Sequence, residues 1–270
     1  MSCGKSQQYY TVFIKQLNGF AQEREIISWA YIIIDFLLGY NRSDCIIHTD
    51  KDITSDISDK LNQIIADLKT NKPIQHIIGE TEFYGLKFKV NEYTLIPRPE
   101  TEELVQWILQ HEFTSALDIG TGSGCIPIAL KKNKDAEISA IDVSESALLV
   151  AKENAKINEV EINFLLQDIL KTTTLPKVDV IISNPPYVLD KEKELMLANV
   201  LDNEPHLALF VPDNNPLLFY KKIADIAFTS LPKNGLLFFE INERFGKETV
   251  AMLSVIGFVD IELKKDIDKI

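Results

Sequence analysis

The sequence predicts an α/β fold, in which a small helical bundle and a β-hairpin precede a mostly parallel sheet with helices on both faces. Two observations lead to this prediction. Beyond residue 113, short apolar strands alternate with helical segments, the order expected when helices connect parallel strands. Before residue 80, apolar residues recur instead at three- and four-residue steps, the spacing of amphipathic helices.

The first 80 residues are expected to form the helical bundle. Apolar positions recur at helical spacing within residues 10–17, 26–37 and 53–68. No recognisable catalytic motif lies in this part of the sequence. We therefore expect residues 1–80 to form a domain that binds a partner or covers a site.

Residues 81–97 are predicted to form a β-hairpin connector. The segment "EFYGLKFKV" alternates apolar and polar residues around Gly85. The next segment, "LIPRPETEELVQWIL", has Pro99 where the first turn of a helix accepts proline. The glutamates that follow Pro99 suit the positive end of that helix. Because Arg98 lies beside them, the roles of Arg98 and Glu100 stay open.

Residues 98–270 are predicted to form the α/β domain. Five strands are expected, at residues 116–119, 138–141, 162–166, 178–182 and 236–241. The first strand runs into "DIGTGSG", a glycine-rich turn whose backbone can approach a ligand closely. This turn is one residue shorter than the dinucleotide-binding motif GxGxxG, and no Lys-Ser or Lys-Thr pair follows as in a P-loop.

Polar residues also end the next three strands. Asp142 ends the second strand, where an acidic side chain can accept hydrogen bonds from both ribose hydroxyls. Asp168 follows the third strand, and "SNPPY" ends the fourth. Because ligands bind at the carboxyl ends of the strands in an open α/β sheet, the sequence predicts a nucleotide-like ligand at this edge.

The prolines of "SNPPY" make the end of the fourth strand rigid. They fix two φ angles and remove two backbone donors, and the residue before a proline adopts an extended conformation. Asn184 is therefore presented rigidly at a strand end. From these residues alone, the segment is either a stiff loop after a buried strand or a place where the Asn184 carboxamide grips a ligand.

Composition excludes several classes of protein. The chain has 270 residues, and 40 acidic against 28 basic residues give a net charge of −12, which argues against a general nucleic-acid binder. The three cysteines form no CxxC motif, and the four histidines lack metal-ligand spacing, so we expect reduced thiols and no metal. The longest apolar run, Trp29 to Tyr40, is too short to cross a bilayer, and the N-terminus lacks a signal pattern. We expect a soluble, cytoplasmic protein without membrane contact.

These motifs resemble the S-adenosylmethionine-dependent methyltransferases that act on amino groups. Their signature (D/N/S)-P-P-(Y/F/W) corresponds to Asn184-Pro185-Pro186-Tyr187. More narrowly, nearly the whole chain resembles the HemK/PrmC family. The segments that carry this resemblance are "LLGYNRSDCIIH", "PIQHIIGETEFYGLKFKVNEYTLIPRPETE", "DIGTGSG", "SNPPY" and "NEPHLAL". The resemblance implies a Rossmann-like class I methyltransferase domain and transfer of a methyl group to a glutamine side-chain nitrogen, N5. The acceptor would be the GGQ motif of class 1 peptide-chain release factors.

The resemblance also implies residue roles. The glycine-rich turn would line the methionyl end of S-adenosylmethionine, and Asp142 would hold the ribose. Asp168 and the backbone of Ile169 would flank the adenine. The implied cofactor-binding residues are Gly120, Thr121, Gly122, Ser123, Gly124, Asp142, Asp168, Ile169 and Asn184.

On the substrate side, the resemblance implies that the Asn184 side-chain oxygen and the Pro185 carbonyl accept the two hydrogens of the glutamine amide. Tyr187 would pack on that planar amide. The implied catalytic residues are Asn184, Pro185 and Tyr187, and Pro186 joins them in substrate binding. The product would be S-adenosylhomocysteine.

Other functions stay open. One is methylation of a ribosomal-protein glutamine, and another is methylation of adenine N6 in a nucleic acid. A third is a non-catalytic binding module that kept the fold. We favour the release factor as partner, expect no direct contact with nucleic acid, and expect a monomer.

Two positions and the C-terminus are left without an assignment. Glu204, in "NEPHLAL", could cap or orient a loop of the site, and Cys125 is expected to be a small buried thiol. Members of the family continue past Lys265-Asp266 with a glycine and a basic residue that lead into a last strand. We therefore expect that antiparallel strand to be missing or shortened here, which would expose an edge of the sheet.

Overall fold

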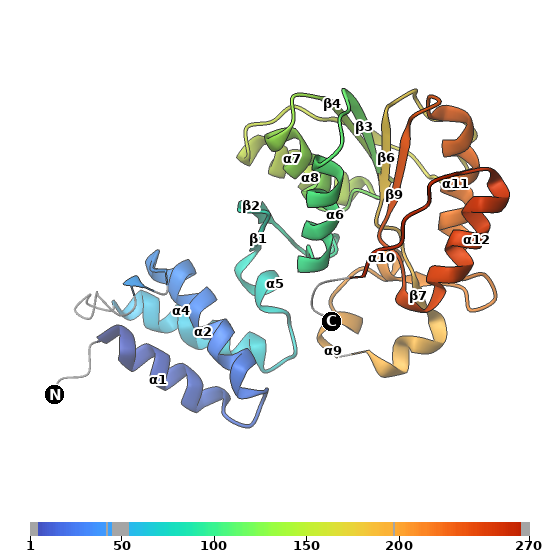
Figure 1. Ribbon diagram of the computed structural model, residues 1–270. Helices are drawn as coiled ribbons and strands as arrows, with labels where there is room; N and C mark the ends of the chain where they lie inside the picture. Colours follow the sequence, from blue (N-terminus) through green and yellow to red (C-terminus); the bar gives the residue numbers. More distant parts are fainter. Residues whose placement is uncertain (1–4, 42, 45–53, 197, 266–270) are drawn as a thin grey trace. The chain divides into compact units, whose positions relative to one another are not determined.

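The computed structural model describes residues 5–41, 43–44, 54–196 and 198–265 (Figure 1). The chain divides into two compact units, Met1–Gly79 and Glu80–Ile270. The described helices include none that is both long enough and apolar enough to cross a membrane.

The first unit is helical, as predicted. Its described helices are α1 (Lys5–Leu17), α2 (Glu23–Leu38), α4 (Ser55–Leu68) and α5 (Ile74–Ile78). The residues with helical spacing in the sequence form its core, which contains Phe13, Leu17, Ile26, Ala30, Ile33, Leu61, Ile64, Ile65, Leu68 and Ile74. Gly39 and Gly79 end α2 and α5 with φ angles of 67° and 77°, the left-handed conformation that glycine adopts without strain.

The second unit is built on a five-stranded sheet in which every neighbouring pair is parallel. Its strands are β3 (Ser115–Ile119), β4 (Glu137–Asp142), β5 (Asn163–Leu166), β6 (Val180–Ser183) and β9 (Leu236–Phe239), in the order β5-β4-β3-β6-β9. These are the five predicted strands, with ends displaced by at most two residues. Parallel pairing places all five carboxyl ends at one edge of the sheet.

Helices cover both faces of this sheet, which confirms the predicted α/β class. On one face lie α6 (Pro99–Leu109), α7 (Cys125–Asn133) and α8 (Glu145–Ile157). On the other face lies α11 (Leu218–Ser230), with α12 (Gly246–Ile256) beside it (Figure 1). Alternation along β3 explains the two layers: Ala116 packs with α6 and α7, and Leu117 packs with α11.

Short elements that the sequence did not predict connect β6 to α11. They are β7 (Val188–Leu189), the 3-10 helix η1 (Asp190–Leu195), α9 (Ala198–Leu201), α10 (His206–Leu209) and β8 (Phe210–Val211). β7 and β8 pair in parallel, which ties the segment after "SNPPY" to the segment after "NEPHLAL". A second 3-10 helix, η2 (Glu243–Phe245), precedes α12.

The predicted hairpin consists of β1 (Glu80–Phe83) and β2 (Leu86–Lys89). Its turn residues Tyr84 and Gly85 both have positive φ angles, 52° and 71°, the geometry of a tight two-residue hairpin turn. The Tyr84 N–H donates a hydrogen bond to Glu102 on α6 at 2.8 Å. This bond fixes a turn residue in a conformation that non-glycine residues seldom adopt.

Two asparagines, one on α8 and one directly after it, form hydrogen bonds with the free edge of β2. Asn154 donates from Nδ2 to the Lys89 carbonyl at 2.9 Å and accepts from the Lys89 N–H at 2.7 Å. The same Nδ2 donates to the Ser123 carbonyl at 2.9 Å, and Asn158 donates to the Lys87 carbonyl at 2.8 Å. One buried asparagine thus joins the hairpin, α8 and the glycine-rich turn.

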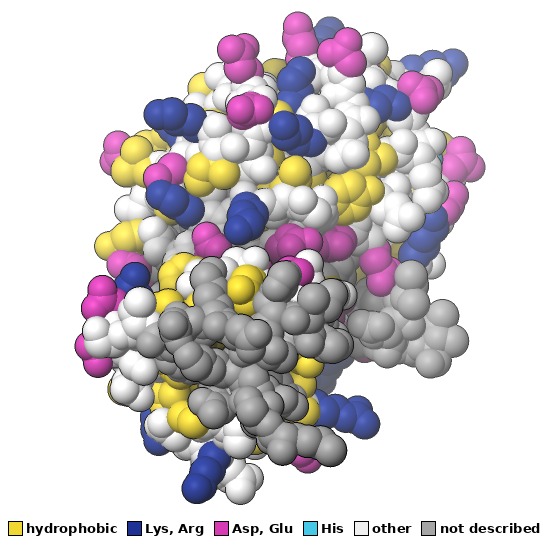
Figure 2. Space-filling model, turned by 90° about the vertical axis from the view of Figure 1, so that its left-hand side faces the viewer, with side chains coloured by type: hydrophobic (Ala, Val, Ile, Leu, Met, Phe, Trp, Pro, Cys, Tyr) yellow, Lys and Arg dark blue, Asp and Glu magenta, His cyan; other side chains and the backbone are white. Residues whose placement is uncertain are grey.

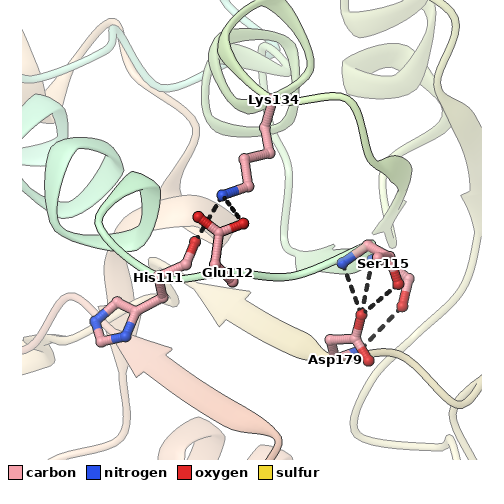
Figure 3. Close-up of polar contacts among 6 residues, drawn as sticks. His111, Glu112, Ser115, Lys134 and Asp179 are labelled. Carbon is pink, nitrogen blue, oxygen red and sulfur yellow. Dashed lines mark hydrogen bonds and ion pairs between the residues drawn. The ribbon is translucent and has the colours of Figure 1, made fainter.

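Polar contacts join the chain segments at the opposite, amino edge of the sheet (Figure 3). The Asp179 carboxylate, just before β6, accepts hydrogen bonds from the Thr114 N–H at 2.8 Å and from the Ser115 N–H at 3.1 Å. The bond from the Thr114 N–H is the main cause that holds the pKa of Asp179 below its ordinary value.

A second contact at this edge follows α7, where the Lys134 ammonium donates to the His111 carbonyl at 2.9 Å. These contacts join the sheet at the edge that carries no predicted site residue.

No further strand pairs with β9 among the residues described up to Lys265. The expected loss or shortening of a terminal strand also concerns residues 266–270, which lie outside the described part of the chain. The segment after α12 packs on α6 instead, where the Lys264 ammonium lies 3.9 Å from the centre of the Trp107 ring. Trp107 in turn contacts Phe238 of β9 edge to face, with ring centroids 5.2 Å apart.

We predict that Asn154→Ala destabilises the protein by about 2–3 kcal/mol, because it leaves the buried Ser123 carbonyl and the part-buried Lys89 backbone groups without their partner. Denaturant unfolding measures this change. Lys152→Ala, an exposed change on the same helix, is the matched control and should shift stability by less than about 0.5 kcal/mol. Equal effects of the two changes would contradict the structural role of Asn154.

Candidate active site

The carboxyl ends of the strands carry most of the residues that the motifs singled out. The glycine-rich turn follows β3, Asp142 ends β4, and Asn184 follows β6 directly. Beyond β9, the Glu240 N–H donates to the Ser183 carbonyl at 3.1 Å. Parallel pairing therefore brings these groups to the edge where open α/β sheets bind ligands.

The glycine-rich turn needs glycine for two reasons. Gly120, Gly122 and Gly124 have φ angles of 77°, 55° and 80°, which side chains disfavour. A Cβ atom at Gly120 or Gly122 would meet no atom within 4 Å, whereas one at Gly124 would lie 3.1 Å from the Ala151 side chain. Open space therefore borders the first two glycines, as close approach of a ligand requires, and Gly124 allows α7 to pack against α8.

The other two residues of the turn, Thr121 and Ser123, have buried side chains. The Gly120 and Thr121 N–H groups both donate to the Ile141 carbonyl, at 2.9 and 3.1 Å, which anchors the turn on β4. The Ser123 carbonyl is held by Asn154. Contacts on both sides thus fix the shape of the turn.

The Asp142 carboxylate is held by backbone donors. Its Oδ2 accepts from the Gly122 N–H at 2.8 Å, and its Oδ1 accepts from the Ser144 N–H at 2.9 Å. Burial raises the pKa of Asp142 above its ordinary value, and these two bonds oppose that rise. Each carboxylate oxygen has further acceptor capacity, so Asp142 can hold the turn and accept a ligand hydroxyl as well.

Asp118 is a candidate site residue that the motif analysis did not single out. Its side chain is 1% exposed, and neither carboxylate oxygen accepts a hydrogen bond from a described residue. Burial raises the pKa of Asp118 to about 7, and the nearby charge of Asp142 adds to the rise. The Thr121 hydroxyl, which lies outside hydrogen-bonding geometry, offsets only part of it. A buried carboxylate without a hydrogen-bond donor favours a cationic group nearby.

Asp168 and Ile169 follow β5 at the same edge. Asp168 forms an ion pair with Lys171 at 2.9 Å and accepts from the Leu170 N–H at 2.9 Å; the bond from Lys171 is the main cause that lowers its pKa. The Ile169 side chain is buried, so it contributes apolar packing next to a half-buried carboxylate. Gln167 links this segment to β4, because its N–H donates to the Asp142 carbonyl at 2.8 Å.

The residues of "SNPPY" contact side chains from other elements. Asn184 donates from Nδ2 to the Thr101 hydroxyl at 3.4 Å, and the Tyr187 hydroxyl donates to Glu240 at 3.3 Å. Burial, followed by the charge of Glu240, raises the pKa of Tyr187 above its ordinary value, so the phenol stays protonated. Pro185 is buried and Pro186 is half-buried.

Glu240 and Thr101 are candidate site residues that the sequence reasoning missed. Thr101 donates to Glu240 at 2.7 Å, and the two residues contact the Asn184 amide and the Tyr187 phenol of the motif, respectively. A signal for Glu240 was partly present, because it is an acidic residue near the end of the fifth predicted strand, residues 236–241, and the structure ends that strand at Phe239. Thr101 had no comparable signal, because only the tertiary fold brings α6 to this edge.

The structure shows the contacts or burial of the residues whose roles the sequence left open. Arg98 forms an ion pair with the buried Glu204 at 2.6 Å, and Glu204 also accepts from the Ile96 N–H at 3.3 Å. Glu100 is exposed, and its charge is one cause that raises the pKa of Glu240. Burial raises the pKa of the Cys125 thiol to about 12, so Cys125 stays protonated and unreactive.

Comparison with protein-family models identifies both units. The model of the PrmC N-terminal domain matches residues 13–79, and the model of the methyltransferase small domain matches residues 99–209. Each match lies within one of the two compact units.

Curated relatives cover nearly the whole chain. A release factor glutamine methyltransferase from Flavobacterium psychrophilum is 48% identical over 97% of this chain and 95% of its own length. One from Bacteroides thetaiotaomicron is 41% identical over 95% of each chain, and one from Streptococcus pneumoniae is 39% identical over 90% of this chain and 87% of its own.

Solved structures agree with the fold at low sequence identity. A methyltransferase from Pyrococcus furiosus has a TM-score of 0.53 at 18% identity, covering 79% of this chain and 93% of its own. The hMettl16 catalytic domain, in complex with the MAT2A 3'UTR hairpin 6, has a TM-score of 0.51 at 16% identity, covering 76% and 74%.

The parallel sheet, the glycine-rich turn and the acidic residues at its carboxyl edge define a class I S-adenosylmethionine-dependent methyltransferase. Within that class, the chain belongs to the release factor glutamine methyltransferase family.

We predict that Asp118→Asn removes a pH dependence. Because the folded pKa of Asp118 is raised to about 7, its protonated form stabilises the free protein at low pH, and this stabilisation is lost as the pH rises through 7. The variant should therefore unfold at a higher temperature than the natural sequence at pH 8. It should also bind the cationic cofactor roughly 10- to 100-fold more weakly there, since a charged partner is lost. Thermal unfolding and calorimetry between pH 5.5 and 8.5 measure both effects.

At pH 8 the variant should thus gain thermal stability and lose cofactor affinity. A substitution that merely disturbs the fold would lower both. A variant that loses stability and affinity together at pH 8 would contradict a buried, ionisable partner for the cofactor.

Proposed function

We propose that this protein transfers a methyl group from S-adenosylmethionine to the side-chain amide nitrogen, N5, of the glutamine in the GGQ motif of class 1 translation release factors. S-adenosylhomocysteine is the second product. The observation that carries the proposal is the identity of 48% with a release factor glutamine methyltransferase across both units of the chain. The acceptor-rich end of β6 supports it, because an amide NH₂ needs acceptors.

The residues at the carboxyl edge suit this cofactor. Open space borders Gly120 and Gly122, and the unpartnered Asp118 carboxylate suits the cationic methionyl end. Asp142 has lone pairs left for the ribose hydroxyls, and Asp168 with the Ile169 backbone would flank the adenine. The remaining members of the proposed cofactor site are Thr121, Ser123, Gly124 and Asn184. When bound, the cofactor supplies an electrophilic methyl group.

The amide-binding residues address a chemical difficulty. An amide nitrogen is a poor nucleophile because its lone pair is delocalised into the carbonyl. In our proposal, the Asn184 side-chain oxygen and the Pro185 carbonyl accept the two N–H groups of glutamine, and Tyr187 packs on the amide plane next to Pro186. Two acceptors favour the positive charge that develops on nitrogen during attack. They also fix the nitrogen in line with the methyl group.

No strong base is required before attack. The amide N–H becomes strongly acidic once the nitrogen carries the methyl group, so the proton is lost to solvent water after the new bond has formed. The protonated Tyr187 and Cys125 fit this scheme, because neither is available as a base.

Charge argues against the nucleic-acid alternative. The net charge is −12, and on the face in Figure 2 the Lys and Arg side chains lie among Asp and Glu side chains. The net negative charge repels a phosphate backbone, and the described residues of this face show no separate basic patch that would bind one. Incubation with labelled cofactor and, separately, a release factor, a ribosomal protein or RNA tests the substrate. Label only in the release factor is the expected result, and label only in another substrate would refute the proposal.

We also propose that the protein acts in the cytoplasm as a monomer, where release factors are available as substrates. Sedimentation of the free protein and of its mixture with a release factor would measure the stoichiometry. A stable dimer at working concentration would refute the monomer.

The catalytic role of Asn184 leads to a prediction. Asn184→Ala removes one amide acceptor and should lower the methylation rate about 10²- to 10³-fold, the scale for losing one preorganised group that stabilises a transition state. Asn184→Asp keeps an acceptor oxygen and should be tolerated in part. Single-turnover rates at saturating cofactor, on variants with unchanged melting temperature, measure the effect. Wild-type speed for Asn184→Ala would remove this residue from the mechanism.

The helical domain is proposed to recognise the release factor. This domain has its own core, and the proposed chemistry uses residues of the second unit only. Removal of residues 1–79 should therefore impair methylation of the whole release factor by about 10-fold or more, with cofactor affinity changed less than about twofold. A short glutamine peptide is the control substrate, since it should be methylated at similar rates by both forms. Equal turnover of whole release factor would contradict a recognition role.

A further inference from the structure

We propose that Thr101 and Glu240 are positioning residues that hold the Asn184 carboxamide with its oxygen toward the substrate. Through this orientation, the site selects an amide NH₂ over a carboxylate. The inference rests on the proposed function and deepens it, because it states how the same site distinguishes glutamine from glutamate.

Three separate elements supply the side chains of this network. Thr101 lies in the first turns of α6, Asn184 follows β6, and Glu240 follows β9. The Thr101 hydroxyl is 2.7 Å from Glu240 Oε2 and 3.4 Å from Asn184 Nδ2, and the Tyr187 hydroxyl is 3.3 Å from Glu240 Oε1. Thr101 is 3% exposed, so its hydroxyl has little access to water as an alternative partner.

Counting donors and acceptors fixes the direction of each bond. A hydroxyl has one proton and two lone pairs, and a carboxylate can only accept. Thr101 therefore gives its proton to Glu240, and the side of its oxygen that faces Asn184 carries a lone pair. Only the NH₂ end of Asn184 can satisfy that lone pair. The Asn184 oxygen is then left for another donor.

The position of Glu240 is itself fixed by the backbone around it. Its N–H donates to the Ser183 carbonyl at 3.1 Å, and its carbonyl accepts from the Tyr220 hydroxyl at 3.3 Å. Burial raises the pKa of Glu240, and hydrogen bonds from the Thr101 and Tyr187 hydroxyls oppose that rise. Both hydroxyls therefore present donors to this carboxylate, as the assigned bond directions require.

Selectivity follows from the orientation of Asn184. With its oxygen toward the substrate, Asn184 accepts a hydrogen bond from the NH₂ of glutamine. A glutamate side chain would place an oxygen against that oxygen, with two acceptors facing each other. If the carboxamide were free to turn, its NH₂ end could instead donate to a glutamate carboxylate, and the preference would weaken.

Thr101→Val and Thr101→Ser test this inference, because valine keeps the shape of threonine without the hydroxyl and serine keeps the hydroxyl. Thr249→Val is the matched control, since Thr249 is also a buried threonine but lies on α12. The measurements are single-turnover methylation of a release factor at saturating cofactor, and competitive inhibition by the same release factor with glutamate in place of its glutamine.

We expect Thr101→Val to slow methylation about 10-fold or more. The ratio of affinities for the glutamine and glutamate forms of the release factor should also fall at least about threefold. Thr101→Ser should retain most of the rate, and Thr249→Val should match the natural sequence. Cofactor affinity should stay within about twofold for all three variants. Should Thr101→Val fail to fold, Glu240→Gln replaces it. Its amide can either donate to or accept from Thr101, so it too should narrow the preference.

Equal rates and preferences for the valine and serine variants would overturn this inference, because the hydroxyl would then have no role. The inference would also be overturned if Thr101→Val, or Glu240→Gln in its place, slowed methylation but kept the full preference for glutamine over glutamate. If the natural sequence itself fails to methylate the release factor, the proposed function falls, and this inference falls with it.

Discussion

Desolvation of carboxylates at one edge of a parallel sheet is the constraint on which this active site depends. The pairing of β3 with β4 and β6, and of β6 with β9, brings Asp118, Asp142 and Glu240 to that edge. Burial is the largest cause that raises the pKa of each of them. The fold therefore keeps acidic groups where water solvates them poorly, an arrangement that favours a ligand with positive charge. A sulfonium cofactor with an ammonium group meets that requirement.

The two halves of the site meet their polar requirements in different ways. On the cofactor side, backbone N–H groups of the turn hold Asp142, while Asp118 keeps unused acceptor capacity. On the substrate side, Glu240 accepts from the hydroxyls of Thr101 and Tyr187, so it collects the donors that would otherwise compete for the substrate. The hydroxyl donors around Asn184 thus point to Glu240. In our proposal, this leaves hydrogen-bond acceptors facing the glutamine amide that receives the methyl group.

Local sequence signals predicted the strands well because each strand is a short apolar run followed by a turn residue. They did not predict β7 and β8, whose two-residue length gives no periodicity and whose pairing depends on distant segments. The same limit applies to the site. The glycines and Asn184 stand in compact motifs, whereas Thr101 and Glu240 are 139 positions apart and share a hydrogen bond only because α6 and β9 are neighbours in the fold.

Asn154 couples the stability of the hairpin to the stability of the glycine-rich turn. Because one side chain holds both Lys89 and Ser123, a conformation that loosens the turn also weakens the pairing of β2. A ligand that binds the ordered turn therefore stabilises the hairpin against opening. By thermodynamic linkage, this stabilisation equals the free energy by which the intact hairpin strengthens ligand binding. The Lys89 amide proton, which Asn154 accepts, therefore becomes an exchange reporter for occupancy of the turn. Mutations in the hairpin would accordingly change ligand affinity without altering any residue of the proposed ligand site.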